Sequence, residues 1–423
     1  MKLNLRFMAI LFFACAAIRA QENSAATSTA ASAGPVGLAV DGTLHYDLRY
    51  SETCQLGGGQ DSQQESYASG DASYANINKR YPFTLQYGGG YGWLWAGQPS
   101  AGNVFQHLSL SQGMLWRSWN FSASDNVSYT FQTPTTGFSG VPGTGEPIGG
   151  PGSTTQTDQT ILTVNTRTLD NATTAGVGHR LDHATTLSFG GVIEQLRYID
   201  DNGQDLNTLA ATASLSRRLN ARNSVSGAYS FSRYDYLGAA QASALQLSYG
   251  QANAMQVSFH RQWNAKFSTG GSFGPQWISS SNSAILPSST RYSAGALAAY
   301  VSKFGNTSIF YSHGVSGGAG YLLGAESDSA GANFSRSIGR NLSVGLTGSY
   351  MRTAGLDGSG AVHAEYGGAQ ATRRLGRTLS LFANYTVADQ SSSLQNTPNL
   401  LNSLSQVIGF GIGYSPRELH FKR

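Results

Sequence analysis

The sequence predicts an all-β fold, a closed antiparallel barrel of about 18 strands (range about 16–18) that crosses a membrane. Three observations predict it. Short runs of alternating apolar and polar residues recur from residue 37 to residue 415. Tight turns and long Gly/Ser/Asn-rich segments join these runs in alternation. Charged residues are only 12% of the chain, which is about half of the usual globular share.

An early run, residues 44–50, illustrates the alternation. Successive side chains of a strand point to opposite faces, so Tyr46, Leu48 and Tyr50 share one face. The polar residues between them form the other face. One wall that separates two different environments over such a length is typical of a transmembrane barrel.

Eighteen strands are predicted from the alternation and the turn residues. Outer-membrane barrels have short periplasmic turns and longer outer loops, so this even number places both ends of the barrel in the periplasm. A secreted sandwich or solenoid is disfavoured, because the runs have no fixed repeat length. The predicted strands are 37–51, 66–79, 81–95, 103–117, 119–131, 159–180, 184–199, 205–218, 223–236, 242–261, 266–279, 291–302, 306–316, 326–337, 341–353, 360–374, 378–389 and 402–415.

Lipid-facing residues are predicted from the apolar half of each alternation. The opposite half is small and neutral, as in Ser343, Gly345, Thr347 and Ser349, which suits a wet interior. The clearest lipid-facing sets are Phe83, Leu85, Tyr87, Tyr91 and Trp93; Leu187, Phe189 and Ile193; Val225, Tyr229 and Phe231; Leu342, Val344, Leu346 and Tyr350; and Leu379, Leu381, Tyr385 and Val387.

The N-terminus has the pattern of a secretory signal peptide over residues 1–20. Lys2 and Arg6 precede an apolar stretch, and Ala20 is the expected residue before the cut. Residues 21–36 are rich in Ala, Ser and Thr and are predicted to form a flexible leader. The barrel is predicted over 37–415, with a short tail at 416–423. No run of about 18 apolar residues occurs, which excludes a helical membrane protein.

The last predicted strand contains VIGFGIGY at residues 407–414, in which a glycine precedes apolar and aromatic residues spaced by two. This pattern resembles the C-terminal insertion signal of porin-like bacterial outer-membrane β-barrels. It departs from that signal because Val407 stands where a polar residue is usual and the chain continues beyond Tyr414. The resemblance covers about residues 37–415. It implies the outer membrane of a Gram-negative bacterium, with outer-membrane lipid and the barrel-insertion machinery as partners.

Charged residues are expected to mark the two rims of the barrel. The outer ends carry acids such as Asp71, Glu326 and Asp328, which predicts an acidic outer mouth. Basic side chains near short turns are expected to reach lipid phosphates. This basic periplasmic rim comprises Lys79, Arg80, Arg217, Arg218, Arg222, Arg336, Arg340, Arg373, Arg374 and Arg377.

A smaller set of charges falls within the predicted strands. These candidate lumen-facing residues are His45, Asp47, Arg49, Glu194, His363 and Glu365. Lone charges in a narrow lumen are costly, so they are expected to pair across neighbouring strands. The longest predicted outer loop, 132–158, is a candidate constriction loop and carries Glu146 and Asp158.

Aromatic residues are expected to form two belts at the membrane surfaces. Trp116, Trp119, Trp263 and Tyr81 lie near the short turns. The belt near the long loops is predicted to contain Tyr50, Trp93, Trp95, Tyr129, Tyr198, Tyr234 and Tyr236.

Catalytic and cofactor motifs are not predicted, so the protein is expected to be no enzyme and to need no cofactor or metal. Residues 314–318 match G-x-S-x-G, but they end a strand and enter a Gly-rich loop, whereas the nucleophile elbow needs a strand-to-helix turn. The basic residues are spread among turns, which excludes a nucleic-acid binder.

The preferred functional prediction is a passive diffusion pore for small hydrophilic solutes, because barrels of about 16–18 strands enclose an aqueous channel. Two alternatives remain open. One is a dedicated export or assembly barrel for an exopolysaccharide, since a neutral polar lumen suits a polysaccharide. The other is a closed structural barrel or adhesin.

Overall fold

The computed structural model describes residues 42–57, 63–76, 80–94, 103–132, 166–199, 205–237, 249–284, 286–303, 305–317, 322, 324–393, 403–417 and 419–421. The predicted signal peptide and leader lie outside the described residues, as do Lys79, Glu146 and Asp158.

Within these ranges, no helix is long and apolar enough to cross a membrane.

The described chain is built from strands in sequence order, and each of β1–β18 is 12–16 residues long. Their bounds are β1 Gly42–Gly57, β2 Gln63–Asn76, β3 Phe83–Leu94, β4 Asn103–Trp116, β5 Trp119–Gln132, β6 Thr166–Arg180, β7 Thr185–Tyr198, β8 Asp205–Arg218, β9 Asn223–Leu237, β10 Tyr249–Gln262, β11 Phe267–Ser280, β12 Ser289–Ser302, β13 Gly305–Ser316, β14 Ala325–Ile338, β15 Leu342–Gly355, β16 Ala361–Arg374, β17 Leu379–Ser392, β18 Ser403–Tyr414 and the short β19 Leu419–Phe421.

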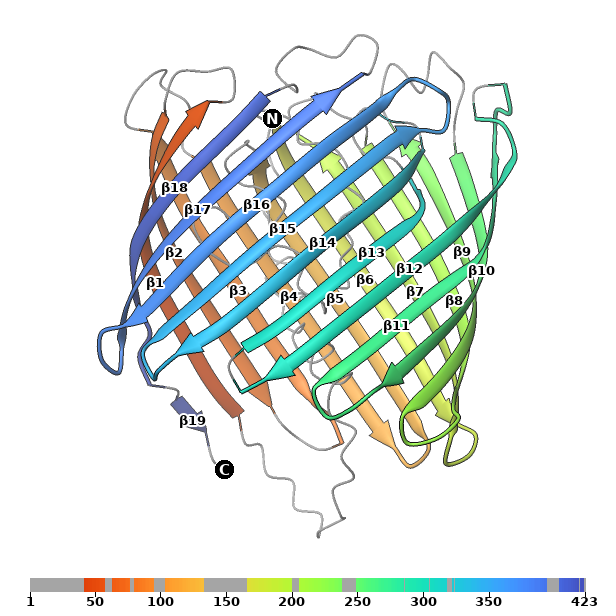
Figure 1. Cartoon of the computed structure of the whole chain (residues 1–423), viewed down its shortest axis with the longest axis horizontal. Coiled ribbons are helices and arrows are strands. Elements are labelled where there is room, and N and C mark those ends of the chain that lie inside the picture. The colour runs from red at the N-terminus through yellow and green to blue at the C-terminus, as the bar shows by residue number, and fades with distance from the viewer. Residues whose placement is uncertain are drawn as a thin grey trace, which may run out of the picture.

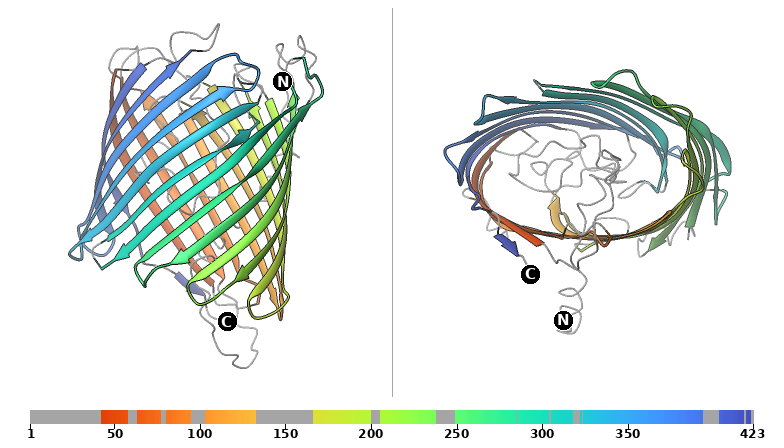
Figure 2. Two further views of the ribbon diagram at one scale, coloured as in Figure 1. Left: turned by 45° about the vertical axis from the view of Figure 1, so that its right-hand side comes forward. Right: turned by 90° about the horizontal axis from the view of Figure 1, so that it is seen from below.

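The strands form one closed antiparallel wall (Figure 1). Each strand from β1 to β18 pairs with the next, and β18 returns to pair with β1 from Leu48↔Tyr414 to Gly57↔Ser405. The short β19 adds to the start of β1, where Gly42 pairs with Phe421. The cross-section is oval when the barrel is viewed along its axis (Figure 2). The prediction of an 18-strand closed antiparallel barrel is confirmed.

Short turns gather at one end of the barrel, and three of them share one side-chain device. An Asp or Asn oxygen accepts hydrogen bonds from two backbone amides further along the turn, which fixes the reversal of the chain. Asp182 Oδ1 accepts from Ala184 and Thr185 at 2.6 and 2.7 Å. Asn220 and Asn264 accept equivalent bonds in their own turns. The first described strand begins, and β18 ends, at this short-turn end.

The two faces of the wall differ as the alternation requires. On the outer face, Leu379, Leu381 and Tyr385 are exposed, with no second sheet packed on them. Register places them beside Ile408, Phe410 and Ile412 of β18, which are also exposed. The predicted lipid-facing sets therefore lie on the outer face. A continuous apolar exterior is what a barrel needs to stand in lipid.

One predicted outer loop was too long. Residues 52–65 were expected to form an outer loop, yet β1 continues to Gly57 and β2 begins at Gln63. The ladder continues through polar residues because antiparallel pairing, as in Gln55↔Gln63, needs only the backbone. A polar stretch indicates residues that lie outside the lipid, but it does not indicate where a strand ends.

Closure between β1 and β18 can be tested with the native Cys54, which faces Ile408 across the seam. In a chain beginning at residue 21, Ile408→Cys should form a disulfide with Cys54 on oxidation, because directly opposed residues lie within disulfide reach. Ile412→Cys, which faces Tyr50, should keep both thiols free. Mass spectrometry of the linked peptides and thiol titration measure both outcomes. Two free thiols in oxidised Ile408→Cys would contradict the closed seam.

The Asp182 turn should depend on pH. The amide of Ala184 and then the hydroxyl of Thr185 hold the pKa of Asp182 below its ordinary value of 3.8. The ionised carboxylate therefore stabilises the turn above that value, and this contribution is lost as the pH falls through the lowered pKa. Amide hydrogen exchange of Ala184 and Thr185 should accelerate at that point. Asp182→Asn should keep their protection at all these pH values, as Asn220 does in its turn, and Asp182→Ala should lose it throughout.

Candidate functional site

The inner face of the barrel is lined mainly by small polar residues and glycine. It is the face opposite to the exposed apolar residues, so register assigns its members strand by strand. Hydroxyl and amide groups bond to one another across strands, as in Ser312–Ser329, Thr347–Asn333 and Ser226–Ser258 at 2.6–2.7 Å. Such a surface is wettable and carries little charge. It is the expected lining of a path for hydrophilic solutes.

Aromatic residues on this inner face lie over glycines of the neighbouring strand. Phe105 faces Gly90, Phe310 faces Gly331 and Phe382 faces Gly411. A Cβ atom at Gly331 would come 2.6 Å from Cζ of Phe310, and the other two glycines are equally crowded by the facing ring. The missing Cβ therefore lets each ring lie along the wall. These glycines keep bulky side chains from projecting into the lumen.

Charge on the inner face is concentrated on one side. In the described strands β8–β18 register assigns no acidic side chain to the inner face, and its arginines, Arg218 and Arg374, lie near strand ends. The side chain of Arg291, near the start of β12, lies 3.9 Å from Glu326 of the outer face. The acids belong to β1, β2, β6 and β7. They are Asp47, Glu65, Asp71, Asp170 and Glu194.

The densest charged group on the inner face is formed by β1, β2 and β4. His45 Nε2 lies 3.2 Å from Asp47 Oδ2. Arg49 Nη2 lies 3.8 Å from Asp47 Oδ2 and 3.6 Å from Asp71 Oδ2. His107 of β4 approaches Asp71 over Gly88, whose missing Cβ leaves room for both side chains. One guanidinium thus balances two carboxylates, and the imidazoles extend the group along the wall.

Sequence analysis identified part of this group. It placed His45, Asp47 and Arg49 together on one side of the first strand, and the structure brings these three into contact. It assigned Asp71 to an outer strand end and did not single out His107. Both lie within strands, and Asp71 faces Asp47 directly. Only the register of β1 with β2 shows that pairing. Glu194 lies on the inner face of β7, opposite Ala172 and Thr208.

Outer loops pack against the inner wall at the loop end. The inner apolar cluster consists of Leu196, Tyr198, Leu206, Tyr234, Tyr236, Ala252 and Leu286, with Leu356 against it. Leu286 comes from the segment between β11 and β12, and Leu356 from the β15–β16 turn. The Tyr236 hydroxyl donates to the carbonyl of Gly317 at 3.1 Å, and Gly317 in turn accepts from Gly324. The outer mouth is therefore narrowed by these folded segments.

This cluster corrects the predicted outer aromatic belt. Tyr198, Tyr234 and Tyr236 were assigned to that belt, but they are buried on the inner face at 6–7% exposure. The prediction that these tyrosines lie near the loops was correct, but the prediction that they face lipid was wrong. The inner face is apolar here because loop residues cover it, so the alternation from apolar to polar disappears near this rim.

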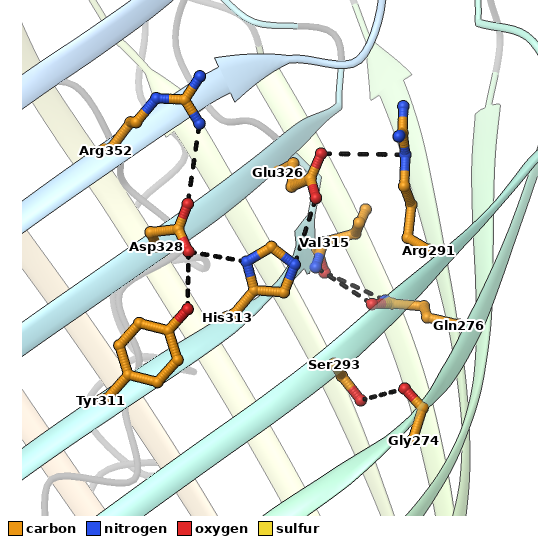
Figure 3. Close-up of polar contacts among 10 residues, drawn as sticks. All are labelled: Gly274, Gln276, Arg291, Ser293, Tyr311, His313, Val315, Glu326, Asp328 and Arg352. Atoms are coloured by element: carbon orange, nitrogen blue, oxygen red, sulfur yellow. Dashed lines mark hydrogen bonds and ion pairs between the residues drawn. The ribbon is translucent and has the colours of Figure 1, made fainter.

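A network of charged residues occupies the outer face near the same rim (Figure 3). His313 of β13 stacks on Tyr292, with ring centroids 4.2 Å apart, and its Nδ1 lies 2.8 Å from Asp328 Oδ1. Asp328 also accepts from the Tyr311 hydroxyl at 3.0 Å and lies 3.8 Å from Arg352 Nη1. These side chains share the face of the exposed Ile309 and Leu346. The acids near this rim are thus balanced by bases.

His363 and Glu365 belong to this outer face and not to the lumen. Register sets Glu365 opposite Tyr350 and Ala369 opposite Leu346, and both Tyr350 and Leu346 are exposed on the outside. The Tyr350 hydroxyl lies 3.0 Å from His363 Nδ1. The predicted lumen position assumed that a charged residue in a strand avoids lipid. Both residues lie near the loop end of β16, outside the lipid.

The basic residues predicted for the periplasmic rim surround the short-turn end wherever the structure describes them. Arg80, Arg222, Arg340 and Arg377 lie in or beside turns. The others are the terminal or near-terminal residues of their strands, namely Arg217, Arg218, Arg336, Arg373 and Arg374. Arg261 adds a related contact at this end, with its guanidinium 4.0 Å from the ring centroid of Trp263.

The G-x-S-x-G string does not assemble a nucleophile and a base. Ser316 belongs to the inner face of β13, whereas His313 belongs to the outer face and contacts Asp328. The two side chains therefore lie on opposite sides of the wall. In the described part of the chain, no group of three or more His, Cys, Asp or Glu side chains could hold a metal ion.

No protein-family model matches the sequence, and no curated protein matches it. Among solved structures, the chain is similar to OpdQ of Pseudomonas aeruginosa, with 10% identity, a TM-score of 0.44, and coverage of 90% of this chain and 99% of that one. OpdL of the same organism gives 10% identity, a TM-score of 0.45 and the same coverage. The FrpB iron transporter of Neisseria meningitidis gives 9% identity and a TM-score of 0.42, over 82% of this chain and 62% of that one.

The attachment of the outer loops can be tested at Leu322, which is fully buried. Leu322→Ala removes a packed side chain and should weaken the docking of its loop by about 2–5 kcal/mol. Limited proteolysis should then cut within residues 317–324 at least tenfold faster. Leu375→Ala, at a half-exposed position in a short turn, is the control and should leave this cleavage unchanged. Equal cleavage in all three proteins would contradict a docked loop.

Proposed function

We propose that the protein is a passive diffusion pore for small hydrophilic solutes in the outer membrane of a Gram-negative bacterium. The observation that carries the proposal is the contrast between the two faces of one closed wall. The outer face exposes Leu346, Ile408 and Phe410, while the inner face at the same strands presents Thr347, Ser405 and Gly409. Lipid solvates the first surface and water the second.

The size of the barrel supports the proposal. Barrel diameter grows with strand number, and about 16–18 strands leave an aqueous channel unless loops fill it. The inner apolar cluster narrows the outer mouth on the β7–β10 side. The glycine-supported rings keep the wall smooth lower down. Solutes would therefore pass a narrowed entrance and then a wide hydroxyl-lined interior.

Charge on the inner wall supports a weak preference among solutes. Arg49 neutralises part of the charge of Asp47 and Asp71, and the inner face of β8–β18 is neutral apart from arginines near strand ends. A strong filter needs a ring of like charges around the path. Such a ring is absent from the described inner face, so neutral polar solutes are the proposed class.

The pore is tested by conductance in planar bilayers, with two neighbouring residues of β15 as a matched pair. Thr347 faces the lumen, and its hydroxyl donates to Asn333. Leu346 faces lipid and is 54% exposed. Thr347→Trp should lower the single-channel conductance by about one third or more, because conductance follows the open cross-section. Leu346→Trp should change it by less than a tenth.

Two results would contradict the proposal. One is a folded, reconstituted barrel without conductance, and the other is an equal effect of both tryptophans. A silent barrel that conducts only after the outer loops are cleaved would favour the closed structural alternative. Block of the conductance by a neutral polysaccharide at micromolar concentration, without block by monosaccharides, would favour the export alternative.

A further inference from the structure

One carboxylate lies on the lipid-facing surface at the middle of the wall. Asp125 shares the outer face of β5 with Phe121, which is exposed. It stands six residues after Trp119 and seven before Gln132, the two ends of the strand. The other acidic and basic side chains on the outer face of the described strands lie nearer to a rim, as Asp328 and Arg261 do. Asp125 is therefore placed where hydrocarbon is expected.

The hydrogen bonds of Asp125 leave one of its oxygens unused. Thr173 Oγ1 donates to Asp125 Oδ1 at 2.6 Å, and Asn171 Nδ2 donates to the same oxygen at 3.3 Å. Among the described residues, Oδ2 has no hydrogen-bond partner. These three side chains, Asp125, Asn171 and Thr173, are called the Asp125 patch below. The patch is polar, lies at mid-depth and is incomplete within one chain.

Lipid alone cannot complete this patch. A charged group on the lipid face costs most at the bilayer midplane, and an intramembrane carboxylate normally has a partner. Lysine and arginine can extend their side chains to the interface. Aspartate is too short to do so from the centre of a strand. A protein surface with hydrogen-bond donors would satisfy Oδ2, whereas acyl chains would not.

A groove beside the patch has the shape for such a contact. It is an open concavity of about 920 Å³ on the outer face of β4–β7. Met114, Phe121, Val177 and Phe189 form its sides. Its floor is made by small residues, and two of them, Ala123 and Ala175, pair directly. The row that contains Asp125 and Thr173 lies directly above this floor.

Membrane geometry restricts what the partner can be. Two copies of one barrel enter the membrane in the same orientation, so a symmetry axis that relates them must run along the membrane normal. Residues that meet across such an axis lie at the same depth. The Asp125 patch contains the unsatisfied acceptor and, in the Asn171 amide, a donor at that depth, whose second N–H makes only a 3.5 Å contact with the carbonyl of Asn126. An isologous contact, in which the patch faces itself across a two-fold axis, meets these conditions.

We propose that two copies of this chain pair through the outer face of β4–β7, with the Asp125 patch at the centre and the neighbouring groove filled by side chains of the second copy. Each copy keeps its own closed lumen, so the pairing does not depend on what passes through the pore. Oδ2 of Asp125 then meets the Asn171 amide of the second copy in place of hydrocarbon, because the single proton of the Thr173 hydroxyl already serves Oδ1 of its own chain. The groove contributes close packing, which drives association in lipid.

Cysteine cross-linking in the membrane tests the pairing with a closely matched control. Ala175 lies in the groove and Ala369 lies on the outer face of β16, and each stands five residues before the end of its strand. Both are introduced as cysteine into the full chain carrying Cys54→Ser, because Cys54 is exposed. After oxidation in outer membranes, Ala175→Cys should give a dimer band at least fivefold stronger than Ala369→Cys. Equal bands, no dimer for Ala175→Cys, or a species larger than a dimer would overturn the proposal.

A second measurement separates the role of Asp125 from general lipid exposure. Asp125→Leu should fold at least as well as the wild type and lower the dimer fraction at least tenfold in native mass spectrometry. Asn253→Leu also removes a polar group from the outer face, where Asn253 accepts from Tyr229, but it lies on β10 outside the patch. This control should leave the dimer fraction unchanged. Retention of the dimer in folded Asp125→Leu, or its equal loss in both variants, would overturn the proposal.

Discussion

Every backbone amide and carbonyl within a lipid bilayer needs a hydrogen-bond partner inside the protein, because hydrocarbon offers none. A sheet can meet this requirement only by closing on itself, and the pairing of β1 with β18 achieves it. The other features depend on that closure. Once the wall is closed, each strand has one lipid face and one inner face, and the two-residue period of the sequence becomes a radial pattern. The outer apolar residues and the inner hydroxyls are two consequences of one constraint.

The fold could be predicted from the sequence to a large extent because this period repeats along the chain. Eighteen strands and their faces follow from alternation, as for Leu379, Leu381 and Tyr385. Prediction failed where another element covers a face. Tyr198, Tyr234 and Tyr236 are aromatic and close to the loops, which suggested a lipid interface, but Leu286 and Leu356 bury them from within. The packing of a distant loop on a strand leaves no periodic pattern in the sequence.

The charged groups of the wall show a different limit. The contact of His45, Asp47 and Arg49 could be predicted because all three alternate along one strand. The ion pair of Arg49 with Asp71 depends on the register of β1 with β2. The approach of His107 over Gly88 depends on two further registers, β2 with β3 and β3 with β4. His363 and Glu365 were misplaced because charge was taken to mean lumen, although polar residues near a rim can face outward. Cross-strand register and depth in the membrane together decide which face a polar residue occupies. Neither can be inferred from a single strand.

The inner aromatic rings and the glycines beneath them bear on how the bore of the tube could change during evolution. Phe105, Phe310 and Phe382 lie flat only because Gly90, Gly331 and Gly411 lack a side chain. At Gly331, where only the facing ring is closer than 3.0 Å, an added methyl group would tilt that ring toward the axis, whereas at Gly90 and Gly411 it would also collide with a backbone carbonyl oxygen. The calibre of the passage is thus set partly by residues that solutes never touch. A small genetic step at Gly331 could therefore retune the permeability of the channel while the ladder of backbone bonds remains intact.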